Sequence, residues 1–376
     1  MKITINRDRF RELVAIVAPA AAKGASVTSG IHLAADDLGR VIATTTDYGL
    51  TIQAWAEADE VIAEGAIVVP AGLLLKILGS LPDSGAVRLA ASSGGGGGVL
   101  ECGSAHFELA GYPVEEFPGD ALEGAAELGR VEVPREHLAA GLRACSPFAA
   151  TSASSPLECV LLELGANRLA MAATDGHRLG AYETPLDTAG RRGRWLIPSG
   201  MASALAAALA ADDGAEPWIA AEARELHAVV GRVTIRGRVD PDLKFPDYRR
   251  VFPAVDARKA ATCNRAVLSA AVRRVAAVAM RDKGSALVTL EFTDAGVNVE
   301  ASSADLGKAT DRLDLFAARN AEFLRIGLNA GFLLEALAVF GQSENVEIQT
   351  SHFLDPVLLT STIEPSISHV CMPMKL

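Results

Sequence analysis

Met1-Lys-Ile-Thr-Ile-Asn-Arg-Asp-Arg-Phe-Arg-Glu-Leu-Val14 opens the chain, and its pattern returns twice. The later copies are Gly129-Arg-Val-Glu-Val-Pro-Arg-Glu-His-Leu-Ala-Ala-Gly-Leu142 and Lys259-Ala-Ala-Thr-Cys-Asn-Arg-Ala-Val-Leu-Ser-Ala-Ala-Val272. In each copy, alternating apolar and polar residues typical of a strand lead into a segment with helical spacing. The copies lie about 130 residues apart, which is the size of a domain. The sequence therefore predicts three similar domains.

A second repeated pattern lies within each third of the chain and again predicts a strand followed by a helix. Its copies are Ala66 to Leu78, Trp195 to Leu205 and Leu324 to Leu337. Pro70 and Pro198 suit a first helical turn, and Asn329 suits a helix cap that accepts backbone N–H groups. Each third is thus predicted to hold two strand-helix-strands units, which gives an α+β fold of six similar units.

The predicted domains are residues 1–124, 125–253 and 254–376. The run Gly94 to Gly98 separates two segments that resemble strands, so a hairpin turn is predicted there. A phosphate-binding loop is the alternative interpretation. No Gly-Lys-Ser/Thr follows the run and no helix is predicted after it, so the hairpin is preferred.

The composition excludes several classes of function. The 376 residues contain 35 Lys and Arg against 46 Asp and Glu, a formal charge of -11, which argues against tight binding to nucleic-acid phosphates. The five cysteines are scattered without a C-x-x-C pair, and the seven histidines lack paired ligand spacing, so no metal and no cofactor is predicted. No apolar run approaches the roughly 20 residues that span a bilayer, and the opening segment has no signal-peptide pattern. A cytoplasmic location is expected.

Asp175 and His177 offer one catalytic interpretation, because a carboxylate can orient an imidazole that activates a nucleophile. No G-x-S-x-G nucleophile elbow accompanies them. The alternative interpretation is a polar turn at the end of a strand. A hydrolase that uses Asp175 and His177 stays a remote alternative, and the prediction is that the protein is not an enzyme.

Three further motifs are Ala173-Thr-Asp-Gly-His-Arg-Leu179, Phe245-Pro-Asp-Tyr-Arg-Arg-Val-Phe-Pro253 and Met372-Pro-Met-Lys-Leu376. Together they resemble the bacterial DNA polymerase sliding clamp, the beta subunit of the replicative DNA polymerase III holoenzyme. The resemblance covers the full chain. It implies the DNA-clamp fold, with three similar domains that form half of a pseudo-sixfold ring and a homodimer that closes head to tail. It also implies a processivity factor that encircles duplex DNA without sequence preference and binds DNA polymerase subunits, the clamp loader and repair factors.

The resemblance assigns site residues by position. The pocket for short partner peptides is implied at Leu157, Thr174, Gly176, His177, Arg178, Leu179, Pro246, Arg250, Val251, Asn329, Phe332, Val346, Val370, Met372, Pro373, Met374 and Leu376. DNA-facing positions are implied at Lys23, Lys76, Arg143, Arg273 and Arg274, and dimer contacts at Phe107, Leu109, Val278 and Ala279. Leucine, valine and methionine would give such a pocket adaptable apolar walls.

The chain also departs from the family pattern. Lys23 to Ser29 lacks the proline-rich segment common in the first domain, and Thr151 to Pro156 lacks the basic and aromatic residues of relatives. Phe332 replaces a frequent tyrosine, and Cys371 replaces a small aliphatic residue. An acidic cluster common near Ser302 to Thr310 is reduced to Asp305. These departures motivate a second hypothesis, in which the chain is a clamp paralogue that acts as a resistance or regulatory variant.

Overall fold

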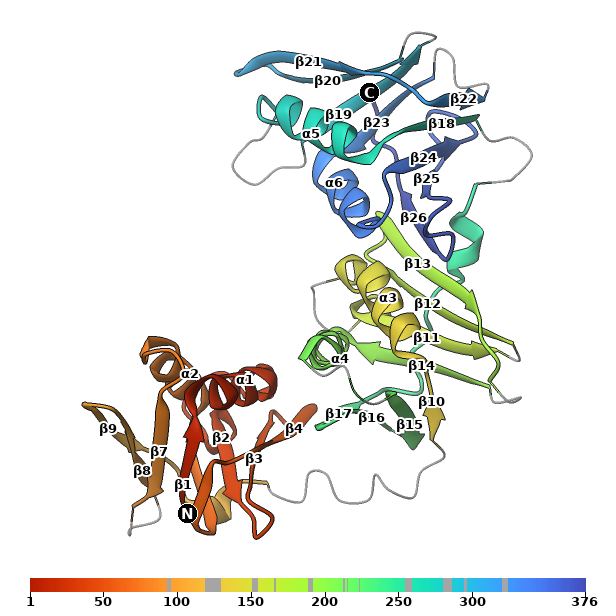
Figure 1. Ribbon diagram of the computed structural model, residues 1–376. Helices are drawn as coiled ribbons and strands as arrows, with labels where there is room; N and C mark the ends of the chain where they lie inside the picture. Colours follow the sequence, from red (N-terminus) through yellow and green to blue (C-terminus); the bar gives the residue numbers. More distant parts are fainter. Residues whose placement is uncertain are drawn as a thin grey trace. The chain divides into compact units, whose positions relative to one another are not determined.

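The computed structural model describes most of the chain, with six α-helices and four β-sheets among the described residues (Figure 1). The described residues are 1–92, 96–118, 130–150, 155–165, 167–188, 192–211, 214, 216–222, 224–253, 259–279, 286–293, 296–319 and 324–376. No described helix is long and apolar enough to cross a membrane.

Six successive segments each contain a strand, a helix and three further strands. The first three segments are β1 (Lys2–Asn6), α1 (Arg7–Val17), β2 (Gly30–Ala35), β3 (Arg40–Thr46) and β4 (Leu50–Glu57); β6 (Gly65–Pro70), α2 (Ala71–Ser80), β7 (Ala86–Ala91), β8 (Gly97–Cys102) and β9 (Ala105–Ala110); and β10 (Val131–Glu132), α3 (Arg135–Cys145), β11 (Cys159–Gly165), β12 (Arg168–Thr174) and β13 (Arg178–Pro185).

The other three segments repeat this order. They are β14 (Gly193–Pro198), α4 (Ser199–Ala211), β15 (Trp218–Glu222), β16 (Glu225–Val230) and β17 (Val233–Arg238); β18 (Lys259–Asn264), α5 (Arg265–Ala276), β19 (Leu287–Thr293), β20 (Gly296–Ser303) and β21 (Gly307–Leu313); and β23 (Arg325–Asn329), α6 (Ala330–Val339), β24 (Asn345–Thr350), β25 (Val357–Thr360) and β26 (Ile367–Cys371). Two short strands are additional, β5 (Glu60–Ala63) and β22 (Ala317–Arg319). The predicted α+β fold of six similar units is confirmed.

The chain divides into two compact units. The first comprises Met1–Ala139 and Ile197–Pro241, and the second comprises Ala140–Leu196 and Asp242–Leu376. The first unit contains a five-stranded sheet of order β5-β1-β7-β8-β9 and an eight-stranded sheet of order β10-β15-β16-β17-β4-β3-β2-β6. The second contains a nine-stranded sheet of order β14-β11-β12-β13-β26-β25-β24-β18-β22 and a four-stranded sheet of order β21-β20-β19-β23.

The two units do not follow the three predicted domains, and the sheets give the physical reason. Strand β17 of the middle third pairs with β4 of the first third, and β13 of the middle third pairs with β26 of the last third. Each half of the middle third thus extends a sheet of its neighbour, which removes exposed strand edges. The predicted boundaries fall within residues 119–129 and beside residues 254–258, outside the described residues, so the three-domain division stays a prediction.

Asparagine caps start three of the helices at equivalent places in the repeat. The Asn6 side chain accepts the Asp8 and Arg9 N–H groups at 3.0 and 3.2 Å to begin α1. Asn264 caps α5 and Asn329 caps α6 in the same way. These side-chain oxygens satisfy N–H groups that have no intrahelical partner. The predicted cap at Asn329 is confirmed.

The helices pack in pairs over the sheets. In the first unit α1 lies beside α2, and in the second unit α5 lies beside α6 (Figure 1). The largest fully buried side chains include Phe10 of α1 and, in the second unit, Phe148, Phe292 and Phe340. Burial of apolar surface of this kind is the main favourable term in folding. All five cysteines are buried and free, as expected for reduced thiols.

The glycine run joins two paired strands. Strand β7 pairs antiparallel with β8, with Ala91 opposite Gly98, and the Ser92 N–H donates to the Gly97 carbonyl at 3.0 Å. The hairpin arrangement is therefore confirmed, although residues 93–95 at its tip lie outside the described residues.

Candidate partner-binding groove

The turn between β12 and β13 is built by its own side chains. The Asp175 carboxylate accepts the N–H groups of His177 and Arg178 at 2.9 and 3.0 Å, and the Thr174 hydroxyl accepts the Gly176 N–H at 3.1 Å. Gly176 has φ +89°, a left-handed conformation that glycine adopts without a steric cost. The sequence Thr-Asp-Gly-His-Arg thus folds locally into a fixed turn that presents His177.

The catalytic interpretation of Asp175 and His177 is wrong. The two Asp175 oxygens are occupied by the backbone of the turn and by the Arg178 Nε atom, which lies 2.9 Å from Oδ2. The carboxylate therefore orients the turn and the Arg178 guanidinium, and it does not orient the His177 imidazole. The polar-turn interpretation is confirmed.

The chain end runs from this turn to strand β23. The Met372 N–H donates to the His177 carbonyl at 2.9 Å, and the Met374 N–H donates to the Gly327 carbonyl at 2.8 Å. A Cβ atom at Gly327 would lie 2.8 Å from the Met374 carbonyl oxygen and 2.8 Å from the Leu376 side chain. Glycine at position 327 therefore permits this close approach of the tail to β23.

A cavity of about 330 Å³ opens between the turn, the start of α6 and the tail. It is lined by His177, Asn329, Phe332, Met372, Pro373 and Met374. The His177 and Phe332 rings are stacked with centroids 6.4 Å apart. The walls are mainly apolar, with an imidazole and an amide that can orient polar groups of a ligand, as is usual for ligand pockets.

Arg178 lies next to this cavity, called the groove below, and connects the turn to α6. Its guanidinium donates to the carboxylates of Asp175 and Glu335, and also to the Pro147 carbonyl at 3.2 Å. Its Cζ atom lies 4.4 Å from the Phe332 ring centroid and 5.1 Å from that of Phe148. The side chain is only 11% exposed, so it ties the turn to α6 and leaves little surface for a ligand.

Arg178 keeps its positive charge in this environment. Burial by itself would lower the pKa of Arg178, but hydrogen bonds and attraction to Glu335 and Asp175 outweigh it and raise the pKa above its ordinary value. The two carboxylates lie on different sequence segments, one in the turn and one on α6. The arginine therefore stays charged and links the turn to α6.

The other predicted pocket residues occupy several positions. Leu179 and Val370 are buried in a cluster with Phe245 and Tyr248. Val346 is fully buried within β24. The exposed positions among them are Pro246, Arg250, Val251 and Leu376, and Leu157 is half-buried. The structure thus brings six of the predicted residues around one cavity, places Thr174, Gly176 and Arg178 in the adjoining turn, and assigns the buried valines to the core of the sheet.

Two of the predicted DNA-facing residues are held in ion pairs. Arg143 donates to the Val339 carbonyl at 2.7 Å and pairs with Glu364 at 2.9 Å, and Arg274 pairs with Asp311 at 2.6 Å. Lys23, Lys76 and Arg273 are exposed and have no acidic partner in the described part of the chain.

The predicted dimer contacts lie at two places. Phe107 and Leu109 alternate with exposed residues on β9, an edge strand of its sheet. Val278 and Ala279 follow α5 and are half-buried.

Two residues of this site were not predicted from the sequence. Glu335 and Phe148 surround the Arg178 guanidinium. Glu335 lies three residues after Phe332 on α6, so helical spacing could have indicated that both share a face. Phe148 carries no comparable signal, because its contact depends on tertiary packing.

Comparisons with known proteins agree with this arrangement. The family model described as the DNA polymerase III beta subunit, N-terminal domain, matches residues 1–122, and the model for the C-terminal domain matches residues 249–375. The beta sliding clamp of Streptomyces coelicolor is 27% identical over 391 aligned residues, with complete coverage of both chains. That of Caulobacter vibrioides is 26% identical, again with complete coverage.

Solved structures show the same fold. The DNA polymerase III beta subunit of Thermotoga maritima matches with a TM-score of 0.87 and 24% identity, covering 100% of this chain and 99% of that one. A sliding clamp of Pseudomonas aeruginosa bound to griselimycin matches with a TM-score of 0.86 and 24% identity over both full chains.

The repeated units, their shared sheets and the groove define a DNA-clamp protein, a class that acts by holding other molecules together. The chain belongs to the bacterial sliding clamp family, the beta subunits of DNA polymerase III.

Proposed function

We propose that two copies of this chain close around duplex DNA and tether a replicative polymerase to it. The family is a non-catalytic processivity factor of DNA replication. Tethering raises the local concentration of the polymerase at the primer end, so rebinding becomes effectively intramolecular. The place of action would be the cytoplasm, where the bacterial chromosome is copied.

The groove between His177, Phe332 and the tail is the observation that carries the tethering function. Its volume of about 330 Å³ lies at the lower end of the range for ligand pockets, which suits a few side chains of a short peptide. The tail, Met372 to Met374, forms one wall, and its methionine side chains can adapt their shape to different apolar partners. A groove of this kind suits the exchange of polymerase subunits, clamp-loader subunits and repair factors.

The charge distribution supports a topological hold on DNA. Helix α4 has no charged residue and α6 has only Glu335, while Arg143 and Arg274 are engaged in ion pairs. Lys23, Lys76 and Arg273 are left as the proposed DNA-facing charges. So few phosphate contacts would bind weakly and would depend less steeply on salt than the roughly six to ten contacts of a tight DNA-binding protein, which suits a ring that must slide.

The unpaired strand edges support closure by a second copy. Within one chain, the last strand of a segment pairs with the last strand of another, β4 with β17 and β13 with β26. The last strands β9 and β21 lie at sheet edges. A head-to-tail pair of β9 with β21 of a second copy would cover both edges, with Phe107, Leu109, Val278 and Ala279 as proposed contacts.

Peptide docking is tested by fluorescence anisotropy with a labelled polymerase-tail peptide. The intact chain is compared with a chain truncated after Cys371, which removes Met372, Pro373 and Met374 from the groove. We expect saturable binding by the intact chain and its loss on truncation. Absence of binding by the intact chain would mean that the fold is kept while the docking function is altered.

The topological hold is tested separately. The clamp is loaded onto nicked circular DNA, and the circles are then linearised. Closed rings are expected to stay on circles and to leave linear DNA through its ends. Equal retention on both would contradict the topological mechanism.

A further inference from the structure

The edge strands β9 and β21 carry opposite charge on their solvent faces. On β9, Phe107 and Leu109 face the core, so His106 and Glu108 face solvent. On β21, Asp311 and Leu313 face the helix side, so Lys308, Thr310 and Arg312 face solvent. The β9 edge thus presents a carboxylate, and the β21 edge presents an ammonium and a guanidinium.

The internal joint between β17 and β4 supplies a register for an equivalent joint between two copies. The tight pair Val230↔Val233 of the β16–β17 hairpin corresponds to Cys102↔Ala105 of the β8–β9 hairpin. Glu108 of β9 therefore corresponds to Arg236 of β17.

On the other side of the joint, the Thr46↔Thr51 pair of β3 and β4 encloses four residues and the Ser302↔Lys308 pair of β20 and β21 encloses five. We align these two pairs because this alignment keeps Lys308 on the solvent face. Lys308 of β21 therefore corresponds to Thr51 of β4. Because Arg236 lies opposite Thr51 in the internal joint, the same register places Glu108 opposite Lys308 of the partner subunit.

The charge match does not depend on that one register. Side chains alternate between the two faces of a strand, so any other register that keeps Phe107 on the core side differs from this one by an even number of residues. A shift by one such step places Glu108 opposite Thr310, with Lys308 and Arg312 as its two diagonal neighbours. Diagonal neighbours are still within reach of long side chains.

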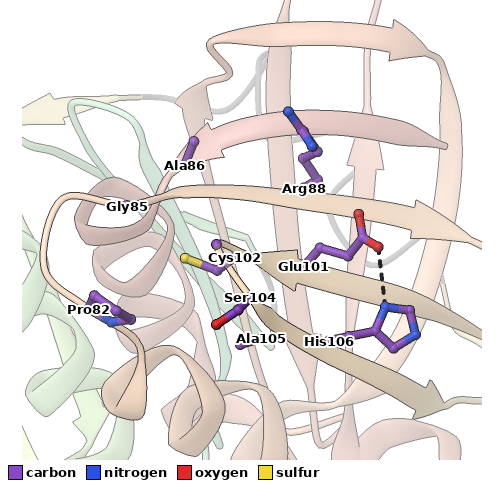
Figure 2. A pocket seen from close by; sticks show the side chains of 10 residues that line it. Pro82, Gly85, Ala86, Arg88, Glu101, Cys102, Ser104, Ala105 and His106 are labelled. Atoms are coloured by element: carbon purple, nitrogen blue, oxygen red, sulfur yellow. Dashed lines mark hydrogen bonds and ion pairs between the residues drawn. The ribbon is translucent and has the colours of Figure 1, made fainter.

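The cavity beside β9 fits the same arrangement. It has a volume of about 680 Å³ and is lined by residues that include Glu101, Ser104 and His106 (Figure 2). Figure 2 shows Glu101 and His106 on one side of the strands, joined by a contact of 3.2 Å. Continued by four residues along each strand, the register places Arg312 of the partner subunit opposite Ser104, at the rim of this cavity and close to Glu101.

We infer that ring closure is selected by charge, with Glu108 of β9 meeting Lys308 of the partner subunit on the outer face of each joint. Lys308 already contacts Glu300 at 2.8 Å, so Glu108 would complete a carboxylate-ammonium-carboxylate row across the subunits. The partner that fits is a second copy of this chain, and a clamp with a basic β9 edge is disfavoured. This inference rests on the proposed ring and adds the residues that choose its partner.

The test uses the full chain and two opposite charge reversals, Glu108→Lys and Lys308→Glu. Each variant alone places like charges across both joints of its homodimer. When the two variants are mixed, the heterodimer has one joint with the reversed pair and one joint with the native pair. The dimer dissociation constant is measured by sedimentation velocity, and the mixed species is counted by native mass spectrometry.

We expect each single variant to dimerise at least about tenfold more weakly at low salt, because exposed pairs contribute little singly but two joints carry the repulsion. The mixture is expected to form mainly heterodimer, and added salt is expected to shrink both effects. Glu64→Lys is the matched control, because it makes the same charge change beside β5, at the opposite edge of the sheet, and should dimerise like the native chain.

The possible failures are distinguishable. A native chain that stays monomeric at all concentrations would overturn the proposed ring itself. A native dimer whose Glu108→Lys variant dimerises equally well, or a mixture that gives a statistical distribution of species, would overturn the charge selection and leave the ring intact.

Discussion

Replacement of Arg178 by alanine tests whether this side chain holds the groove together. The change removes donors to Asp175, Glu335 and the Pro147 carbonyl, and it removes a cation from the faces of Phe332 and Phe148. The hydrogen bond to Asp175 is largely buried, with side chains 11% and 18% exposed, so its loss costs about 1.5–3 kcal/mol. The cation–π contacts add about 1 kcal/mol.

The two remaining contacts contribute little, and the hydrogen bond to the Pro147 carbonyl is exposed. Glu335 is 53% exposed and regains water when the arginine is removed, so its pair with Arg178 contributes below about 1 kcal/mol. Contributions within one network are not additive. We therefore expect Arg178→Ala to lower the free energy of unfolding of the second unit by about 3 kcal/mol.

Urea unfolding followed by tryptophan fluorescence measures this change. Of the three tryptophans, Trp195 alone lies in the second unit, so a Trp55→Phe/Trp218→Phe background reports on that unit. Arg249→Ala is the matched control, because the Arg249 side chain is 39% exposed, against 11% for Arg178, and its loss should cost about 1 kcal/mol or less. The same variants are then titrated with the labelled tail peptide.

Two results would refute this argument. A stability loss for Arg178→Ala below about 1 kcal/mol, or no larger than that for Arg249→Ala, would mean that the contacts around the guanidinium carry little energy. Unchanged peptide affinity despite a large loss of stability would mean that the contacts of the Arg178 guanidinium support the fold without positioning the groove. Arg178→Lys, which keeps the charge but not the forked geometry, should fall between the native chain and the alanine variant.

The remaining predictions concern acid stability, the tail and DNA binding. His369 is buried between Phe148 and Phe340, and burial lowers its pKa to about 3, with Arg143 and Arg178 acting in the same direction. The unfolded chain binds this proton near pH 6.5 and the folded chain does not, so the contribution of His369 to the free energy of unfolding is complete above pH 6.5. It is lost as the pH falls toward 3, by up to about 1.4 kcal/mol per pH unit. Urea unfolding at pH 7.0 and 5.5 should show this loss of stability, and the loss should be smaller in His369→Phe. Gly327→Ala should displace the tail and weaken peptide binding by about 1–3 kcal/mol in anisotropy titrations, whereas Gly79→Ala, which has open space around it, should bind like the native chain. Binding of unclosed protein to linear DNA should weaken by no more than about 40-fold between 50 and 200 mM salt, because the three proposed cations neutralise about three phosphates; a steeper loss by filter binding would contradict the assignment of a few free cations.

Local sequence determined the repeated units and the turns of this protein. Alternation and helical spacing predicted the strand-helix order because burial of one face requires those periods. The Thr-Asp pairs at Thr46-Asp47 and Thr174-Asp175 fold into similar turns, since each pair accepts backbone N–H groups two or three residues ahead. Asn329 capped its helix for the same local reason.

Only the tertiary structure decided which strands and side chains meet. The pairs β4 with β17 and β13 with β26 join segments far apart in sequence, and a strand edge carries no mark of its distant partner. The same holds for Arg178, whose sequence position suggested a groove wall and whose surroundings make it a buried tie to Glu335. Arg143 and Arg274 were likewise predicted to face DNA, and the structure places them in ion pairs with Glu364 and Asp311. Local patterns fix the elements because their hydrogen bonds lie within a few residues, whereas partners across the chain are chosen by packing of the whole fold.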